Sequence, residues 1–474
     1  MGKVWIALFV IFIVYAAIIF NLIKDFKQLP SPIFGGDYYY QLGSVYHILN
    51  SPPGDWFKSS NILGHSATYS PIYGAVVAAF SVVTGLTPIQ SIFYSNFPFL
   101  LISLVTAFFL FKFITKDTKV SIIGVLVFLP FTVFPVLKYT ELVHVFAIPL
   151  FLVALFRLYE KQTLKRALLL GVIYGMLTLL QPTGIIIGTA FVLFFLFYSV
   201  FSHVFENLMK EFSIASLIPS LSDKEKLVEN IKKASIFFFV AFVIGFLIAQ
   251  IWWFKPIFEL GGKSQAMVNE WGFQDFSSFT FQFIFLFETL TQYVFNFSGL
   301  LEGAISILGL LGLWFLLFKK EESPESKFVL LTFIVSTFLT FHYFITAPLI
   351  GTYFGPNYMS FLIFKLGFIL VAIHALARLA KLGVNDVKWL NGFGRFTGYL
   401  SHLMILFVLV NAVFGYDGWY NDRWKAVGRT PFIPQYSELQ SYLLANTSVN
   451  DVILSSNEIS FVINAISGRK AVAF

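Results

Sequence analysis

The sequence contains no cysteine and few charged residues. Without Cys among its 474 residues, the chain has no disulfides, thiolate metal sites or cysteine nucleophiles. Asp, Glu, Lys and Arg make up 12% of it, against roughly 25% in an ordinary soluble domain. Because 57% of the residues are hydrophobic, too few polar side chains exist to cover a water-facing globule, and we predict an integral membrane protein.

The sequence also lacks the motifs of nucleotide chemistry. It has no Walker phosphate loop, dinucleotide fingerprint, His-Glu-x-x-His pair or Ser nucleophile elbow. The missing phosphate loop argues against an ATP-driven pump in this chain. The formal charge of +7 comes from Lys and Arg in the loops between apolar runs, so we predict membrane lipids and no nucleic acid as partners.

Apolar runs about as long as a bilayer is thick recur along the chain. A helix needs about 17–25 apolar residues to cross the hydrocarbon core, and backbone groups in lipid must bond within the chain. Two stretches, 69–84 and 279–295, are short or interrupted by polar residues, and we place both as helices on the outer membrane surface. We otherwise predict an all-α polytopic membrane protein with about eleven transmembrane helices, at 4–23, 91–111, 120–137, 142–159, 165–181, 183–201, 234–254, 299–318, 328–350, 358–377 and 397–415.

Lys and Arg are distributed unequally between alternate loops. With the N-terminus inside, the inner segments hold twenty of them and the outer segments eleven, and cytoplasmic loops are enriched in these residues. We therefore predict a cell-membrane protein with a cytoplasmic N-terminus and an extracytoplasmic C-terminus. The longest inner piece, 202–233, has the Lys/Glu mixture of a solvated amphipathic helix. The large outer pieces are 24–90, 255–298 and 416–474, so any chemistry should face outward.

The C-terminal tail has the pattern of a small α/β unit. Its predicted elements are a helix at 436–445, a strand at 451–455, a helix at 459–466 and a strand at 470–474. Gly468 is expected to end the second helix. A unit of this size buries too little apolar surface to be stable alone, which suggests a piece of a longer protein. We divide the chain into a transmembrane domain, 1–415, and the start of an external α/β domain, 416–474.

The first external loop carries an acidic residue among aromatic residues. Asp37 follows two glycines and precedes Tyr38 and Tyr39. One interpretation is a helix N-cap, whose carboxylate accepts backbone N–H bonds. The other is a general base at the outer membrane face. In that second interpretation Tyr38, Tyr39 and His65 of the same loop are candidate substrate-binding residues.

The next external turn is short and carries a second acid. Glu141 lies where the helix dipole favours a carboxylate by about 0.3–1 kcal/mol, which explains it without chemistry. Glu141 and His144 are three residues apart, so they share a helix face. Together with Asp37 they are candidate ligands of a divalent cation, Mg or Mn. The plainer alternative for His144 is a hydrogen-bonded residue at the interface.

Three cations fall where a lipid phosphate would lie. Lys365 is inside a predicted helix, about seven residues or one-third of the bilayer below the outer end. Charges at such depth usually face a cavity or a partner, although a long side chain can also reach the interface. Lys255 follows an aromatic pair, and Arg423 lies at the start of the tail. All three are candidate lipid-phosphate ligands.

The order of these features resembles the GT-C superfamily of membrane glycosyltransferases, which includes oligosaccharyltransferase catalytic subunits and protein mannosyltransferases. The resemblance covers about residues 1–200, and 358–377 loosely. It consists of a cytoplasmic N-terminus, one helix, a long external loop with Gly36-Asp37-Tyr38-Tyr39 and Ser70-Pro71-Ile72-Tyr73, and Glu141 at the next external turn. In such families the first acid acts as base or orients the acceptor, and the second assists it or binds a metal. Asp37 and Glu141 match these positions.

The tail resembles the opening of the outer domain of oligosaccharyltransferase-like proteins. In those proteins the first strand leads into a Trp-Trp-Asp-Tyr-Gly motif that reads the acceptor sequon. This chain has Ser455-Ser456-Asn457-Glu458 there instead, and it has no Asp-x-Asp metal pattern. The resemblance therefore implies neither sequon recognition nor a defined metal site.

The family implies a reaction at the outer face, where no nucleotide sugar is available. A sugar would move from a polyprenyl (dolichyl)-phosphate-linked donor to a glycan, lipid or protein acceptor. The lipid phosphate is then the leaving group, and a cation or metal stabilises its charge. The alternatives are a secondary transporter and a non-catalytic membrane subunit. Transporters commonly show repeats with broken helices, and the sequence has no such period.

Overall fold

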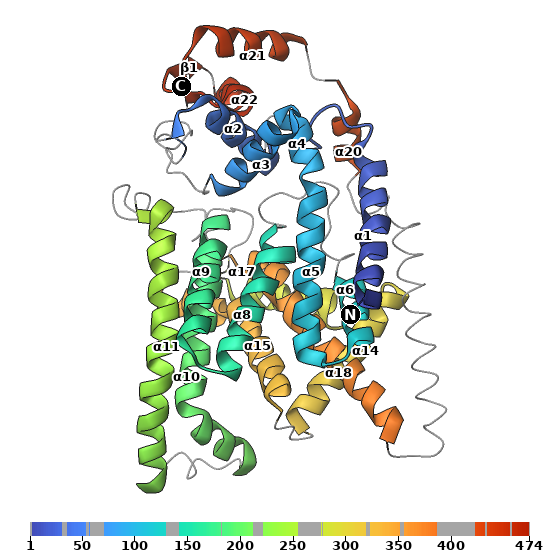
Figure 1. The fold of residues 1–474 in the computed structure, drawn as a ribbon, viewed down its shortest axis with the longest axis vertical. Coiled ribbons are helices and arrows are strands. Elements are labelled where there is room, and N and C mark those ends of the chain that lie inside the picture. Colours follow the sequence, from blue (N-terminus) through green and yellow to red (C-terminus); the bar gives the residue numbers. More distant parts are fainter. Residues whose placement is uncertain are drawn as a thin grey trace.

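The computed structural model of the protein is almost entirely helical (Figure 1). It describes residues 2–30, 36–53, 56, 71–128, 142–181, 183–211, 221–254, 276, 278–318, 323–350, 355–385, 422–431, 434–455 and 457–473. Within these ranges, the β-structure is one pair of short strands in the tail. The predicted helical membrane fold with a small α/β piece at the C-terminus is confirmed.

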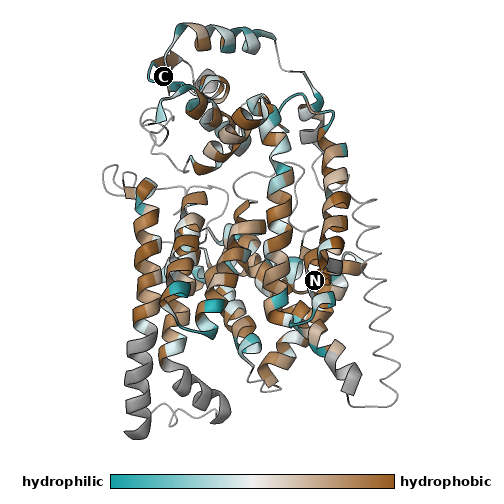
Figure 2. Cartoon of the chain, in the orientation of Figure 1, coloured by the Kyte–Doolittle hydropathy of each residue, from teal (hydrophilic) through white to brown (hydrophobic). Residues whose placement is uncertain are grey.

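Eight helical segments of the described chain are long and apolar enough to cross a membrane. Hydrophobic residues predominate along these helices (Figure 2). Large apolar side chains are exposed on them, for example Phe239 and Leu247, which are 63% and 58% exposed. Lipid is the medium that suits such a surface. The segments belong to α1 (Gly2–Ile23), α4 (Pro88–Tyr94) with α5 (Asn96–Thr115), η2 (Val143–Ala147) with α8 (Ile148–Glu160), α10 (Thr183–Glu211), α11 (Leu221–Phe254), α14 (Leu300–Phe318), α15 (Pro324–Phe341), and α17 (Pro356–Met359) with η5 (Ser360–Phe364) and α18 (Lys365–Asn385).

The remaining helices are shorter. The predicted span at 165–181 corresponds to α9, and the one at 120–137 begins with α6. The one at 397–415 lies outside the described residues, so the total number of spans stays a prediction. The short helices of the membrane part and of the first loop are α2 (Gly36–Asn50), α3 (Ile72–Thr84), α6 (Thr118–Phe128), α9 (Leu164–Leu180), α13 (Phe279–Tyr293) and α16 (Tyr343–Ile350).

Two predicted elements have different bounds in the structure. The span predicted at 328–350 is broken at His342, whose imidazole Nδ1 lies 2.7 Å from the carbonyl oxygen of Leu339. The break lets Tyr343 donate a hydrogen bond to the carbonyl of Gln282 in α13, 3.0 Å away. The stretch 202–233 is no separate helix, because its described parts extend α10 and α11 beyond the membrane spans.

The two stretches that we placed on the outer surface form α3 and α13. They have 13 and 15 residues, fewer than a transmembrane helix needs. α3 lies beside α2 and α4, above the long helices (Figure 1). Val82 and Val83 of α3 are 72% and 85% exposed, as expected of a helix whose apolar side rests on lipid.

The tail folds as the strand–helix–strand unit that the sequence predicts. It comprises α20 (Asp422–Arg429), α21 (Pro434–Asn446), β1 (Val452–Ser455), α22 (Asn457–Ser467) and β2 (Lys470–Ala473). The strands pair in parallel, with Val452 opposite Lys470. Gly468 has a φ of +68° and ends α22, as expected. How far this unit forms a separate domain stays a prediction.

The tail packs on α2, the first helix of the first external loop. α22 lies against α2 (Figure 1). A Cβ atom added to Gly43 of α2 would lie 2.7 Å from the backbone oxygen of Asn464, and one added to Gly468 would collide with the backbone of His47. The two backbones therefore approach more closely than any side chain would allow. We call α2, α3, α4 and the tail elements together the outer assembly.

A single buried glutamine links three parts of the outer assembly. The amide of Gln28 donates to the carbonyls of Val427 and Thr430, at 2.9 and 3.0 Å. Its oxygen accepts a hydrogen bond of 3.2 Å from the hydroxyl of Tyr39 in α2. The segment after α1 thus joins α20 to the helix that begins beside Asp37.

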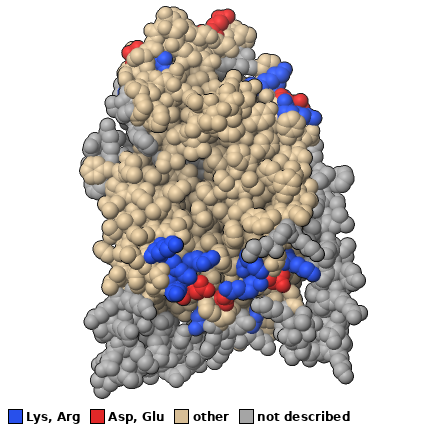
Figure 3. Space-filling view, in the orientation of Figure 1, with Lys and Arg blue, Asp and Glu red and all other residues tan. Residues whose placement is uncertain are grey.

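Lys and Arg gather at the opposite end of the bundle (Figure 3). This basic end comprises the end of α5, the start of α6, the turn between α8 and α9, and the start of α15. Lys116 pairs with Glu325 at 2.9 Å, and Arg166 with Glu160 at 3.5 Å. The separation agrees with the predicted inner side, while the orientation of the termini stays a prediction.

Candidate functional site

Most candidate residues from the sequence fall where the structure gives no side-chain detail. Glu141, Lys255 and His65 lie outside the described residues, and so do the side chains of Asp37 and Arg423. The backbone places Asp37 in the first turn of α2, which begins at Gly36. The catalytic assignments of Asp37 and Glu141 and the phosphate assignments of Lys255 and Arg423 therefore stay predictions.

His144 is fully buried between two helices. Its Nδ1 lies 3.0 Å from the carbonyl oxygen of Leu362, which is 218 residues away in the chain. Its ring stacks on Phe361 with centroids 5.0 Å apart, and Phe128 lies 5.4 Å away on another side. Nδ1 facing a carbonyl must carry the proton, which leaves Nε2 as an acceptor. That atom has no hydrogen-bond partner among the described residues.

Both helices widen at this contact. In η2 the N–H of Ile148 bonds to the carbonyl of Val143, five residues back. Pro149 follows and has no N–H to donate, so a regular α-helical ladder is interrupted there. In η5 the N–H of Lys365 bonds to the carbonyl of Ser360 in the same five-residue pattern. Single π-helical turns of this kind are frequent at functional sites.

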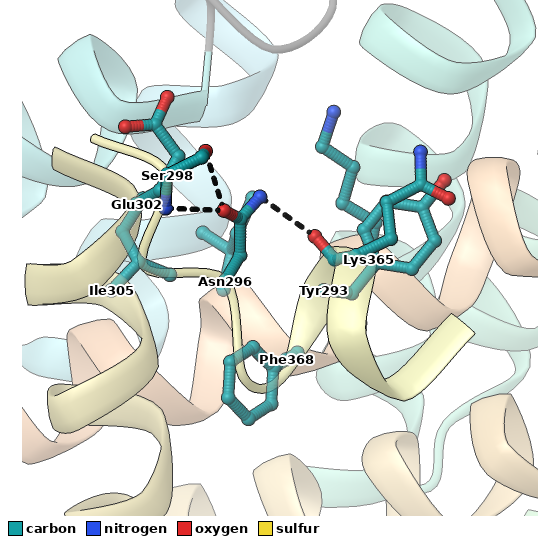
Figure 4. Close-up of a pocket in the computed structure, with 9 residues that line it drawn as sticks. Tyr293, Asn296, Ser298, Glu302, Ile305, Lys365 and Phe368 are labelled. Atoms are coloured by element: carbon teal, nitrogen blue, oxygen red, sulfur yellow. Dashed lines mark hydrogen bonds between the residues drawn. The ribbon is translucent and has the colours of Figure 1, made fainter. Parts of the chain in front are cut away.

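Lys365 is the first residue of α18, and its side chain reaches into a cavity (Figure 4). Its Nζ lies 6.0 Å from the centroids of both the Tyr293 and Phe361 rings, at the limit of a cation–π contact. Lys365 is nine residues beyond Pro356, where this span begins, which is about 14 Å along the helix. Lys365 is half-buried, and of its two interpretations the cavity is the one that the structure supports.

The cavity has a volume of about 190 Å³, room for several water molecules or a phosphate-sized group. Its wall is polar on one side, where Asn296 accepts hydrogen bonds from the N–H and hydroxyl of Ser298 at 3.1 and 2.6 Å. Gln292 and Ser298 at the rim are exposed, and Glu302 is the carboxylate in the lining. Tyr293, Asn296 and Glu302 were not predicted from the sequence as site residues. A cluster of polar residues just before an apolar run was the available signal.

The chemistry of this cavity suits an anion better than a divalent cation. One carboxylate and one ammonium group line it, and its other polar groups are amides and hydroxyls. In the part of the chain that the structure describes, no three His, Asp or Glu side chains come together as a metal site. A divalent cation on Asp37, Glu141 and His144 would use the buried Nε2 of His144. This metal site stays a prediction, because the structure does not describe the side chains of Asp37 and Glu141.

Tyr38 and Tyr39 lie inside the outer assembly. They are 6% and 1% exposed. The hydroxyl of Tyr39 donates to Gln28, and burial raises the pKa of Tyr39, so it stays a neutral donor. These contacts hold α2 in place. The substrate-binding assignments of both tyrosines and of His65 stay predictions.

No family model matches this chain, but part of it is similar to a protein of known sequence. A stretch of 124 residues, 26% of this chain, is 37% identical to the uncharacterized protein MJ1080 of Methanocaldococcus jannaschii and covers 90% of that protein. The chain belongs to the family of this archaeal protein. Because that relative is itself uncharacterized, the kinship carries no activity to the chain.

Two crystal structures share the fold of nearly the whole chain. ArnT from Cupriavidus metallidurans bound to undecaprenyl phosphate matches with a TM-score of 0.54 over 99% of this chain and 86% of that chain, at 12% identity. ArnT in the apo state matches with a TM-score of 0.50 over 99% and 85%, at 11% identity. ArnT is a GT-C glycosyltransferase, so the GT-C fold implied by the sequence resemblance is confirmed. At this identity the likeness concerns the fold alone.

Proposed function

We propose that the protein is a membrane glycosyltransferase that takes a sugar from a polyprenyl-phosphate-linked donor. The observation that carries this proposal is the GT-C fold over 99% of the chain, shared with ArnT crystallised with undecaprenyl phosphate. A polyprenyl phosphate keeps its tail in the bilayer and presents the sugar at the surface. The acceptor would be a glycan, lipid or protein on the outer face.

The Lys365 cavity supports a phosphate subsite. As the bond to the sugar breaks, negative charge develops on the lipid phosphate, and a fixed cation that is shielded from water stabilises it strongly. Lys365 has this position, with amide and hydroxyl groups of Asn296 and Ser298 on the facing wall (Figure 4). Lys255 and Arg423 are further candidates for the same phosphate.

The acidic residues supply the proton chemistry in this proposal. Asp37 at the start of α2 acts as the general base that deprotonates an acceptor hydroxyl or orients an amide. Glu141 assists it or, with Asp37 and His144, holds Mg or Mn, which would supply Lewis-acid stabilisation of the leaving phosphate. The site faces outward, with the N-terminus in the cytoplasm.

Measurement of the lipid-linked sugars in living cells tests this function even when the sugar is not known beforehand. Cells that lack the protein should accumulate one polyprenyl-phosphate-linked sugar, because its consumption stops. The wild-type gene should restore the normal level and Asp37→Asn should not, with both proteins present in equal amounts. Lipid extracts analysed by mass spectrometry give the readout. An unchanged lipid-linked pool in the deleted strain would overturn the proposal.

A further inference from the structure

A second, larger cavity at the basic end is lined by residues of α5, α8 and α9. Its volume is about 560 Å³. Along α8 and α9 the lining changes from charged to apolar with distance from the basic end, while α5 contributes Phe113, Phe109 and, deepest, Thr106. Arg157 and Phe113 lie near that end, while Leu150 and Ile173 lie two or more turns deeper. The cavity is therefore amphipathic along the membrane normal, with its cations at the membrane boundary.

The three cations of the lining have different contacts. Arg166 is occupied, because its guanidinium donates to the carbonyl of Arg157 and pairs with Glu160. The guanidinium of Arg157 stacks 4.2 Å from the centroid of the Phe113 ring, which fixes it at the mouth of the cavity. Lys165 is exposed and lies in the first turn of α9. No ion pair of Arg157 or Lys165 appears among the described residues.

The start of α9 lacks its own compensation for the helix dipole. Its N-cap residue, Thr163, makes no side-chain cap hydrogen bond, and no acidic residue lies in the first turn. Instead Lys165 and Arg166 place two positive charges beside the positive end of the dipole, which is unfavourable. An anion at this point would accept hydrogen bonds from the first N–H groups of α9 and neutralise the two cations.

We propose that this cavity binds an anionic phospholipid, with its phosphate headgroup between Arg157 and Lys165. The acyl chains would follow the apolar lining, which opens to the bilayer: Phe109 and Leu169 are 38% and 51% exposed. Basic pockets between transmembrane helices at this membrane face recognise such headgroups. A free phosphate would leave the apolar part of the cavity empty, so a lipid fits the whole lining. The site lies at the end of the bundle opposite the outer assembly, apart from the proposed transfer site.

Native mass spectrometry of the purified full-length protein tests this site. Detergent-solubilised protein is titrated with phosphatidylglycerol or with phosphatidylcholine of the same chain length. We expect one tightly bound phosphatidylglycerol and weaker phosphatidylcholine. Each lost cation should weaken binding of the anionic lipid about fivefold, so the double variant Arg157→Gln with Lys165→Gln should weaken it about twenty-five-fold. Phosphatidylcholine binding should change little.

Lys161→Gln is the matched control, because Lys161 is exposed in the same turn and does not line the cavity. It should change the affinity less than about twofold. Equal binding of both lipids, or equal losses in the control and the double variant, would overturn the proposal. Inorganic phosphate or polyprenyl phosphate displacing the phospholipid at equal concentration would also overturn it. Since the readout is lipid binding and not sugar transfer, its outcome is independent of the proposed function.

Discussion

A lysine within a membrane span loses part of its hydration shell, and contacts with other groups must compensate for this loss. Lys365 does so with the ring faces of Tyr293 and Phe361 and with a polar cavity that reaches the exposed rim of Gln292 and Ser298. A half-buried charge inside a membrane span is costly and usually faces a cavity or a partner. The sequence predicted the charge and its depth. It did not predict the cavity, because Tyr293 lies 72 residues earlier on another helix.

Substitution of Lys365 separates a ligand role from a packing role. Lys365→Gln removes the charge and keeps most of the side-chain volume. Loss of a charged hydrogen bond of about 1.5–3 kcal/mol should weaken polyprenyl phosphate binding and slow sugar transfer by about tenfold or more. Thermal stability should be unchanged or higher, because a partly buried charge is gone.

The control for Lys365→Gln is Lys119→Gln, which removes an exposed lysine at the basic end. Binding of polyprenyl phosphate to both purified variants in detergent gives the comparison. Equal affinities for the wild type and Lys365→Gln would remove Lys365 from the phosphate site.

At the scale of the helices and strands, periodicity predicted most elements and missed their irregularities. The apolar runs placed α1, α8 and α14 within a few residues, and Gly468 ended α22 as expected. The break at His342 and the widened turns of η2 and η5 were not predicted, because the spacing of apolar residues does not register a local change in helix geometry. The hydrogen bond from His144 to Leu362 joins two such turns. No local pattern encodes a contact across 218 residues.

The contact between the tail and α2 is tested by two glycines with the same backbone conformation. Gly468 and Gly85 have φ values of +68° and +71°, so an alanine at either position costs roughly 1–2 kcal/mol in backbone strain. A Cβ on Gly468 also meets the backbone of His47, whereas one on Gly85 meets nothing within 4 Å. Gly468→Ala should therefore release the tail, and Gly85→Ala should not.

Limited proteolysis of the two glycine variants provides the measurement. The tail of Gly468→Ala should be cleaved at least about tenfold faster than that of Gly85→Ala, since exposure of the tail follows its undocking free energy. Equal cleavage rates for both variants would show that the close approach of Gly468 to α2 does not hold the tail.

At the scale of the whole molecule, charge and hydropathy predicted the polarity of the fold. The basic end and the outer assembly lie at opposite ends of the bundle (Figure 3), as the loop charges indicate. The site was less accessible to prediction. Asp37 and Glu141 stand out in the sequence as acids in external turns, but a helix cap and a dipole contact explain them equally well. Measurements of activity and stability in variants of Asp37 and Glu141 distinguish these interpretations.

Cysteine labelling tests the orientation directly, because the chain has no native cysteine. Glu438 of α21 and Lys161 of the α8–α9 turn are both exposed. In intact cells a membrane-impermeant maleimide should label Glu438→Cys and spare Lys161→Cys. After permeabilisation it should label both. The reverse pattern would invert the topology and place the proposed site in the cytoplasm.

The central claim is sugar transfer from a lipid-linked donor with Asp37 as the base, and a reconstituted assay tests it most directly. Purified protein in liposomes is supplied with polyprenyl-phosphate-linked sugars and with acceptor membranes from cells that lack the protein. Release of polyprenyl phosphate is then measured for the wild type and for Asp37→Asn. Asp37 lies in the first turn of α2, where loss of a carboxylate from the helix dipole costs at most about 1 kcal/mol, so the variant should nearly keep its thermal stability and lose about a hundredfold or more in rate. Wild-type turnover by Asp37→Asn would contradict the account, and so would a parallel loss of stability and activity.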